Sequence, residues 1–243
     1  MTKGAFDKRV LIIYGKHLPY IMEEYKERER DDMSRIILVR HGETEWNKEE
    51  VFRGRIDVKL NSTGLSQAEE TGKALSGEAI QVVYTSPLSR AYDTAGKIVH
   101  FQDAPVVIED SFTDLDFGEW QGLPLSEVRE RYSDIYLRWR DEPHRVKFSG
   151  GESLREVSER SKSALQKLIL EHPEETCAIV SHRVICKVMI LSMLGLPLER
   201  FWDIRQDTCA ISIFLYQERR WIVELLNDTC HLKALQKERL SDF

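Results

Sequence analysis

Short apolar runs alternate along the chain with longer segments whose apolar residues recur at helical spacing. Runs of branched residues bounded by turn-forming residues are typical of strands buried on both faces, and the longer segments are typical of amphipathic helices. The predicted strands cover residues 36–39, 81–85, 106–108 and 176–180, and the predicted helices cover residues 61–75, 88–99, 154–170 and 184–194.

This alternation predicts an α/β fold with a mainly parallel central sheet and helices on both of its faces. Two shorter helical segments, 125–132 and 135–140, predict a small helical cap. The alternating segments 209–216 and 221–226 predict a C-terminal hairpin at the edge of the sheet. Residues 34–243 are expected to form a single domain. Residues 1–33 are expected to form an N-terminal extension, for which the sequence pattern predicts no definite structure.

Composition excludes two broad classes of partner. The chain has 243 residues and a formal net charge of −6, which argues against general binding to nucleic acids or membrane surfaces, because both are anionic. Its four cysteines show no Cys-x-x-Cys spacing and predict reduced core residues. Because no apolar run reaches the roughly 18 residues of a membrane span and no signal peptide is recognisable, we expect a cytoplasmic protein.

The chemistry that the sequence suggests lies where two of the predicted strands end. Arg40 and His41 follow the first strand, and His182 follows the strand 176–180. In an open α/β sheet, ligands bind at the carboxyl ends of the strands. A guanidinium group and an imidazole there can meet an anion, the imidazole as a nucleophile that needs no metal. Arg90, in the first turn of the helix after the second strand, favours the same anion because a cation is unfavourable at a helix N-terminus.

Four motifs give a family resemblance. The string from Leu38 to Asn47 resembles the signature of the histidine phosphatase superfamily, also called the phosphoglycerate mutase-like family. The segment from Thr85 to Ala91, the strand that ends in His182, and a loop anchored on Gly118 resemble its other motifs. The resemblance implies that His41 is the nucleophile, with His182 as the second catalytic histidine and Asn47 as a binding residue.

The same resemblance assigns further residues to the phosphate and leaving-group sites. Arg40 and Arg90 would grip the phosphate, and a Phe-x-Gly loop, here Phe52, Arg53 and Gly54, would cradle it. With Gly118 as the anchor, the acidic position falls on Asp114, where family members carry Glu; Asp116 and Glu119 are weaker candidates for the acid. Arg183 stands where the family usually has a small residue, and it adds a cation at the mouth of the pocket.

We therefore expect a metal-independent phosphomonoester hydrolase that forms a phosphohistidine and uses no cofactor. Its partners would be a small phosphorylated substrate and inorganic phosphate. The sequence leaves open whether the protein forms a homodimer. The family branch of alpha-ribazole phosphatase and the broad-specificity phosphatases looks most similar. Three alternatives are a 2,3-bisphosphoglycerate-dependent phosphoglycerate mutase, a protein-phosphohistidine phosphatase and a non-catalytic phosphate-binding module. The mutases carry Glu-Arg-His-Tyr-Gly where this chain has Asp114-Leu-Asp-Phe-Gly118, which favours the hydrolase.

Overall fold

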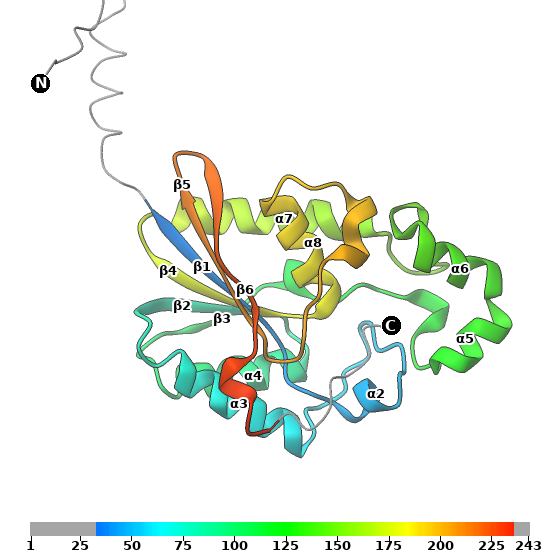
Figure 1. The fold of residues 1–243 in the computed structure, drawn as a ribbon, viewed down its shortest axis with the longest axis horizontal. Helices are drawn as coiled ribbons and strands as arrows, with labels where there is room; N and C mark the ends of the chain where they lie inside the picture. Colours follow the sequence, from blue (N-terminus) through cyan, green and yellow to red (C-terminus); the bar gives the residue numbers. More distant parts are fainter. Residues whose placement is uncertain (1–32, 236–243) are drawn as a thin grey trace, which may run out of the picture. The chain divides into compact units, whose positions relative to one another are not determined.

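The computed structural model describes residues 33–235, and these form one α/β sheet layered between helices (Figure 1). The strand order is β3-β2-β4-β1-β5-β6, with the first four strands parallel and β5 antiparallel to β1. Strand β6 closes the hairpin with β5 at the sheet edge. The six strands are β1 (Ser34–Arg40), β2 (Ile80–Thr85), β3 (Val106–Ile108), β4 (Thr176–Ser181), β5 (Ile211–Gln217) and β6 (Arg220–Asp228). The predicted fold class, including its C-terminal hairpin, is confirmed.

Both faces of the central strands are buried. Ile36 and Leu38 face one hydrophobic layer, while Ile37 and Val39 face the other, because successive side chains of a strand point to opposite sides. Helices α7 (Leu154–Glu171) and α8 (Arg183–Met193) cover the first face, and α3 (Ser62–Ala74) and α4 (Ser89–Val99) cover the second (Figure 1). A parallel strand in this position must be apolar throughout, which explains the unbroken run in β1.

The predicted helical cap consists of α5 (Leu125–Arg131) and α6 (Ser133–Asp141). Edge-on aromatic rings anchor it to the rest of the domain. Phe117 contacts Phe52, Trp139 and Phe148 at ring-centroid distances of 5.2, 5.9 and 5.0 Å. Such packing fixes ring orientation as well as burying apolar area. The loop that carries Phe52 therefore packs against a layer of aromatic rings.

Helix starts follow the polar signals in the sequence. Asn61 Oδ1 accepts a hydrogen bond from Gly64 N at 2.8 Å and caps α3. Ser153 and Glu156 form a reciprocal capping box at the start of α7. The remaining short elements are α2 (Glu45–Lys48) and the 3₁₀ turns Asp110–Phe112, Gly118–Trp120, Pro143–Arg145, Leu198–Asp203 and Cys230–Leu232.

Two expectations need correction. Cys230 is exposed, whereas Cys177, Cys186 and Cys209 are buried and unpaired as expected. The first strand of the hairpin begins at Ile211 rather than at Cys209, because Cys209 has a φ of 53°, outside the range of a strand. The expected extension, residues 1–33, lies outside the described residues except for Met33 and stays a prediction. No helix within residues 33–235 combines the length and hydrophobicity that crossing a membrane requires.

Gly118 gives a test of how the loop bearing Asp114 is held. Its φ is 52°, and a Cβ there would lie 1.9 Å from the carbonyl oxygen of Ser149. We expect Gly118→Ala to lower the free energy of unfolding by more than about 2 kcal/mol, since strain and a backbone clash add. Urea unfolding measures this change.

The control is Gly77→Ala. A Cβ at Gly77 meets nothing within 4 Å, so this variant should stay within about 0.5 kcal/mol of the parent protein. Equal stability of the two variants would show that the backbone around Gly118 yields easily.

Candidate active site

Two histidines meet at the carboxyl end of the sheet. Strands β1 and β4 are neighbours and parallel, and their register pairs Arg40 with Ser181. His41 and His182, each one residue further on, therefore emerge side by side, with ring centroids 5.1 Å apart. Both are buried, at 1% and 0% exposure. The predicted meeting of the two imidazoles is confirmed.

The His41 ring is held in one tautomer. Its Nδ1 lies 2.6 Å from the carbonyl oxygen of Gly42, which can only accept, so Nδ1 carries the proton and Nε2 keeps its lone pair. Burial, followed by the charges of Arg90, Arg40 and Arg53, holds the pKa of His41 well below its usual value. The ring is thus neutral and offers an unprotonated nitrogen.

His182 is held in the opposite tautomer. Arg90 Nε donates to its Nδ1 at 3.2 Å, so the proton is on Nε2, which lies 2.7 Å from Ser86 Oγ and donates to it. Burial and then the charge of Arg90 lower the pKa of His182 as well. Ser86 was not among the residues expected here, although it lies within the motif that suggested Arg90.

Arg90 is completely buried and clamped by a loop. Its Nη2 donates to the carbonyl oxygen of Gly54 at 2.7 Å, and its Nη1 donates to that of Ile56 at 2.9 Å. Asp57, further along the loop, accepts from the backbone N–H and the hydroxyl of Ser89 at 2.8 Å each. The loop is therefore fastened directly to the start of α4, where the arginine lies.

Gly54 is required for the shape of this loop. Its φ is 51°, and a Cβ would come within 2.3 Å of Oε1 of Gln121. Only glycine fits such a backbone without strain. The carbonyl that orients Arg90 thus lies on a backbone conformation that favours glycine.

Asp114 places a carboxyl group close to both Arg90 and His182. Its Oδ2 lies 3.5 Å from Arg90 Nη2 and 3.8 Å from His182 Nδ1, and its Oδ1 accepts from the N–H of Leu115. Arg160 holds this loop from α7 by donating to the carbonyl oxygens of Ser111 and Asp114. Nothing in the sequence singled out Arg160, because an arginine on an amphipathic helix looks like a solvated residue.

The weaker acid candidates lie elsewhere. Asp116 accepts from the N–H of Gly118, and Glu119 accepts from Ser149 Oγ. Both carboxylates thus hold the loop rather than face the histidines. The short side chain of Asp114 reaches the site because its backbone approaches closely, as Ser181 Oγ donates to the carbonyl oxygen of Phe112 at 2.7 Å.

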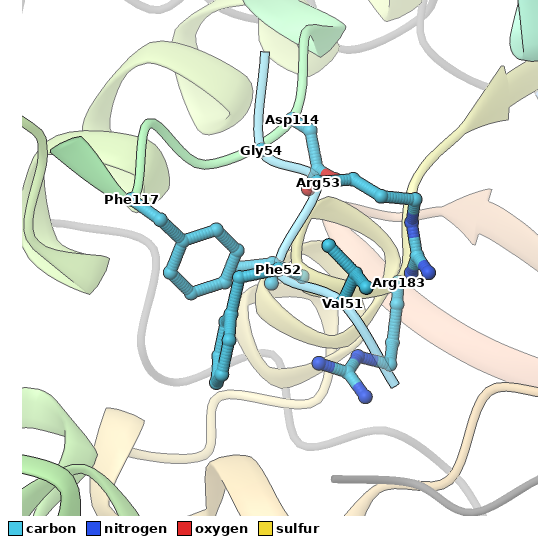
Figure 2. A pocket seen from close by; sticks show the side chains of 8 residues that line it. Val51, Phe52, Arg53, Gly54, Asp114, Phe117 and Arg183 are labelled. Carbon is cyan, nitrogen blue, oxygen red and sulfur yellow. The ribbon is translucent and has the colours of Figure 1, made fainter. Parts of the chain in front are cut away.

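Further arginines surround the same space. Arg40 Nη1 donates to the carbonyl oxygen of Gln206 at 2.5 Å. A small hollow beside Asp114 is lined by Arg53, Gly54 and Arg183 together with apolar residues (Figure 2). Burial and the charges of the other arginines hold the pKa of Arg53 well below its usual value. A concentration of buried cations with one carboxylate is suited to binding a multiply charged anion.

Asn47 and Phe52 have structural contacts that the sequence did not predict. Asn47 Oδ1 accepts from the N–H and the hydroxyl of Thr44, which caps α2. The ring of Phe52 packs on Phe117 and Trp120, and its backbone bonds to Gly122 and Leu123. Their expected contacts with substrate stay predictions.

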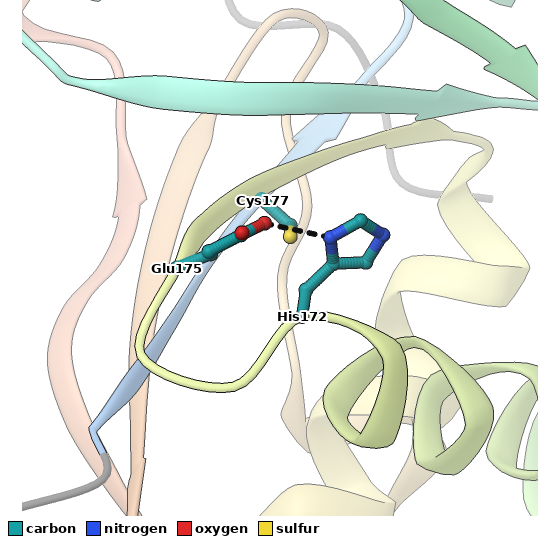
Figure 3. A group of neighbouring side chains, drawn as sticks. All are labelled: His172, Glu175 and Cys177. Atoms are coloured by element: carbon teal, nitrogen blue, oxygen red, sulfur yellow. Dashed lines mark hydrogen bonds and ion pairs between the residues drawn. The ribbon is translucent and has the colours of Figure 1, made fainter.

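One other cluster in the described part of the chain has side chains of the kind that bind metals. His172, Glu175 and Cys177 lie near the start of β4, at the opposite end of that strand from His182 (Figure 3). His172 already bonds to Glu175 at 2.7 Å and to Tyr84 OH at 2.9 Å, and burial raises the pKa of Cys177 to about 12. The group is therefore a hydrogen-bonded network with a protonated thiol.

The chain is similar to known proteins over most of its length. Residues 36–229 match the Histidine phosphatase superfamily (branch 1). Phosphoserine phosphatase 1 of Hydrogenobacter thermophilus is 40% identical over 82% of this chain and 95% of its own length.

Solved structures of similar proteins share the fold. Bacillus stearothermophilus YhfR superposes with a TM-score of 0.80 at 26% identity, over 82% of this chain and all of that chain. Phosphoserine phosphatase from Entamoeba histolytica, solved as a mutant with phosphoserine, gives 0.75 at 28% identity, over 82% of this chain and 99% of that chain. The chain belongs to the histidine phosphatase superfamily and is a phosphoric monoester hydrolase.

Proposed function

We propose that this enzyme hydrolyses a small phosphomonoester through a phosphohistidine on His41, with Asp114 as proton donor and acceptor. The observation that carries the proposal is the neutral His41 ring, whose Nδ1–H is held by Gly42 within a ring of guanidinium groups. An unprotonated nitrogen beside several cations is what attack on a phosphate dianion requires.

The first half-reaction transfers the phosphoryl group to the protein. The His41 Nε2 lone pair forms the N–P bond while the bond from phosphorus to the ester oxygen breaks. Arg40 and Arg90 stabilise the charge on the equatorial oxygens, and protonated Asp114 delivers its proton to the departing alkoxide.

The second half-reaction regenerates the enzyme. Asp114, now a carboxylate, takes a proton from a water molecule, whose oxygen attacks phosphorus as the N–P bond breaks. Inorganic phosphate and the neutral His41 ring result. Because the same carboxyl group serves both steps, its closeness to Arg90 and His182 supports this assignment over Asp116 and Glu119, which hold the loop.

Phosphoserine is the substrate that we propose first. The similarity to phosphoserine phosphatases at 40% and 28% identity, each over most of the chain, supports this choice. The position of Asp114 near Arg90 and His182 also supports an enzyme rather than a protein that only binds phosphate.

Removal of the nucleophile is the direct test. His41→Ala should lower turnover at least about 10³-fold, because covalent catalysis is lost. With labelled substrate, the parent protein should give an acid-labile, base-stable phosphoprotein, and the variant should give none. His100→Ala, which removes an exposed histidine at the end of α4, is the control and should label normally. Label that survives in His41→Ala would refute the assignment.

Two Asp→Asn substitutions of equal size, at Asp114 and at Asp116, test which residue is the acid. Asp114→Asn should lower turnover by about 10² to 10⁴ at pH 6 to 7, since proton transfer is lost. Its affinity for inorganic phosphate, measured by calorimetry, should not fall. Asp116→Asn keeps the oxygen that accepts from Gly118 and should retain activity. The reverse result would move the acid role to Asp116.

The lowered pKa values of His41 and His182 predict how stability depends on pH. Above about pH 6.5 both rings are neutral in the folded protein and in the unfolded chain. Below it, the unfolded chain binds protons that the folded protein excludes, so each ring lowers the free energy of unfolding by up to about 1.4 kcal/mol per pH unit. Urea unfolding between pH 7 and 5 measures the slope, which the double variant His41→Gln, His182→Gln should reduce. An unchanged slope would contradict the neutral rings.

A further inference from the structure

Guanidinium groups gather around Arg53 beside the hollow. Arg53 feels the charges of Arg40, Arg90 and Arg183, and the charge of Asp114 acts in the opposite sense. The histidine rings are neutral. During the first half-reaction Asp114 is itself protonated, so its charge no longer offsets that of Arg53.

Arg53 is the clearest sign of an absent partner. It is only 7% exposed, and its Nε and Nη1 have no hydrogen-bond partner within the described part of the chain. Buried guanidinium N–H groups are costly when unsatisfied, so such groups usually meet a ligand. The backbone that carries Arg53 is fixed, because Phe52 and Gly54 on either side form hydrogen bonds through their backbones.

Arg183 lies on the same hollow but comes from a different element. It is the first residue of α8, whereas Arg53 lies on the loop after α2, and both line the hollow next to Asp114 (Figure 2). The rest of the lining is largely apolar, with Val51, Phe117 and Val184. Two cations in apolar surroundings attract an anion more strongly than they would in water.

The presence of Asp114 identifies what this hollow receives. In the proposed mechanism, Asp114 protonates the oxygen of the leaving group, so the space that it shares with Arg53 and Arg183 is where the leaving group lies. A second charge carried by the leaving group would meet these two arginines rather than Arg40 or the histidine pair.

We propose that Arg53 and Arg183 form a second anion subsite that selects phosphomonoesters carrying another acidic group close to the ester oxygen. This inference rests on the proposed hydrolase function and names its substrate class. The second group is a carboxylate or a second phosphate, since both accept hydrogen bonds from guanidinium groups in the same geometry.

Matched substrate pairs test the inference on the unmodified protein. O-phosphoserine differs from O-phosphoethanolamine only by its carboxylate, and 3-phosphoglycerate has a carboxylate where glycerol 3-phosphate has a neutral hydroxymethyl group. We expect kcat/KM to be at least about tenfold higher for the acidic member of each pair, the effect of one charge-assisted interaction. A third pair, 2,3-bisphosphoglycerate and 3-phosphoglycerate, shares the carboxylate and tests whether a second phosphate adds to its effect. Ratios near one in all three pairs would overturn the proposal.

Charge-removing variants then assign the effect to residues. R53Q and R183Q should each lower the preference for phosphoserine over phosphoethanolamine about tenfold, mainly by raising the KM of phosphoserine more than that of phosphoethanolamine. R200Q removes an exposed arginine that pairs with Asp203 and should leave the preference unchanged. Equal losses on both substrates would mean that Arg53 and Arg183 serve only the transferred phosphate, which contradicts the subsite.

Failure of the subsite differs from failure of the hydrolase mechanism. If the parent protein hydrolyses p-nitrophenyl phosphate and phosphoethanolamine but shows no preference for acidic substrates, only the subsite is wrong. If it hydrolyses none of these esters and forms no phosphohistidine, the proposed function is wrong.

Discussion

Several guanidinium groups buried at one edge of the sheet repel one another, and hydrogen bonds with the surrounding loops hold them in place. Arg90 is kept in place by the carbonyl oxygens of Gly54 and Ile56, and Arg40 by that of Gln206. Neutral dipoles can orient a cation without cancelling its charge, whereas carboxylates would cancel it. The pocket therefore keeps a strong positive field that is ready before an anion arrives, which is the form of electrostatic stabilisation that contributes most to catalysis.

This constraint explains the loops that surround the histidines. A carbonyl aimed at a buried arginine requires an unusual backbone, and Gly54 supplies it with a φ of 51°. The loop of Asp114 is bent in the same way at Gly118 and is tied to α7 by Arg160. Edge-on aromatic contacts beneath Phe52 resist any sliding of these loops. The polar network and the hydrophobic core thus depend on each other.

The sequence was sufficient for the fold and for the centre of the site, because both follow from local patterns. Apolar runs marked the strands, and parallel neighbours necessarily deliver His41 and His182 to the same edge. The sequence did not reveal Ser86 and Arg160, whose roles depend on contacts between residues far apart in the chain. Nor did it reveal the positive φ of Cys209, which has no compositional signal. The N-terminal extension, the substrate contacts of Asn47 and Phe52, and a homodimer stay predictions.

The register between β1 and β4 has a consequence for how such an enzyme can diverge. Because the two imidazoles follow paired residues on adjacent strands, their 5.1 Å spacing is close to the roughly 4.8 Å repeat of any sheet, and mutation elsewhere can hardly alter it. The residues that line the leaving-group side come instead from connecting segments and from the first turn of α8. Descendants of this chain can therefore acquire new substrates by changing those segments alone, while the reaction itself is inherited with the backbone.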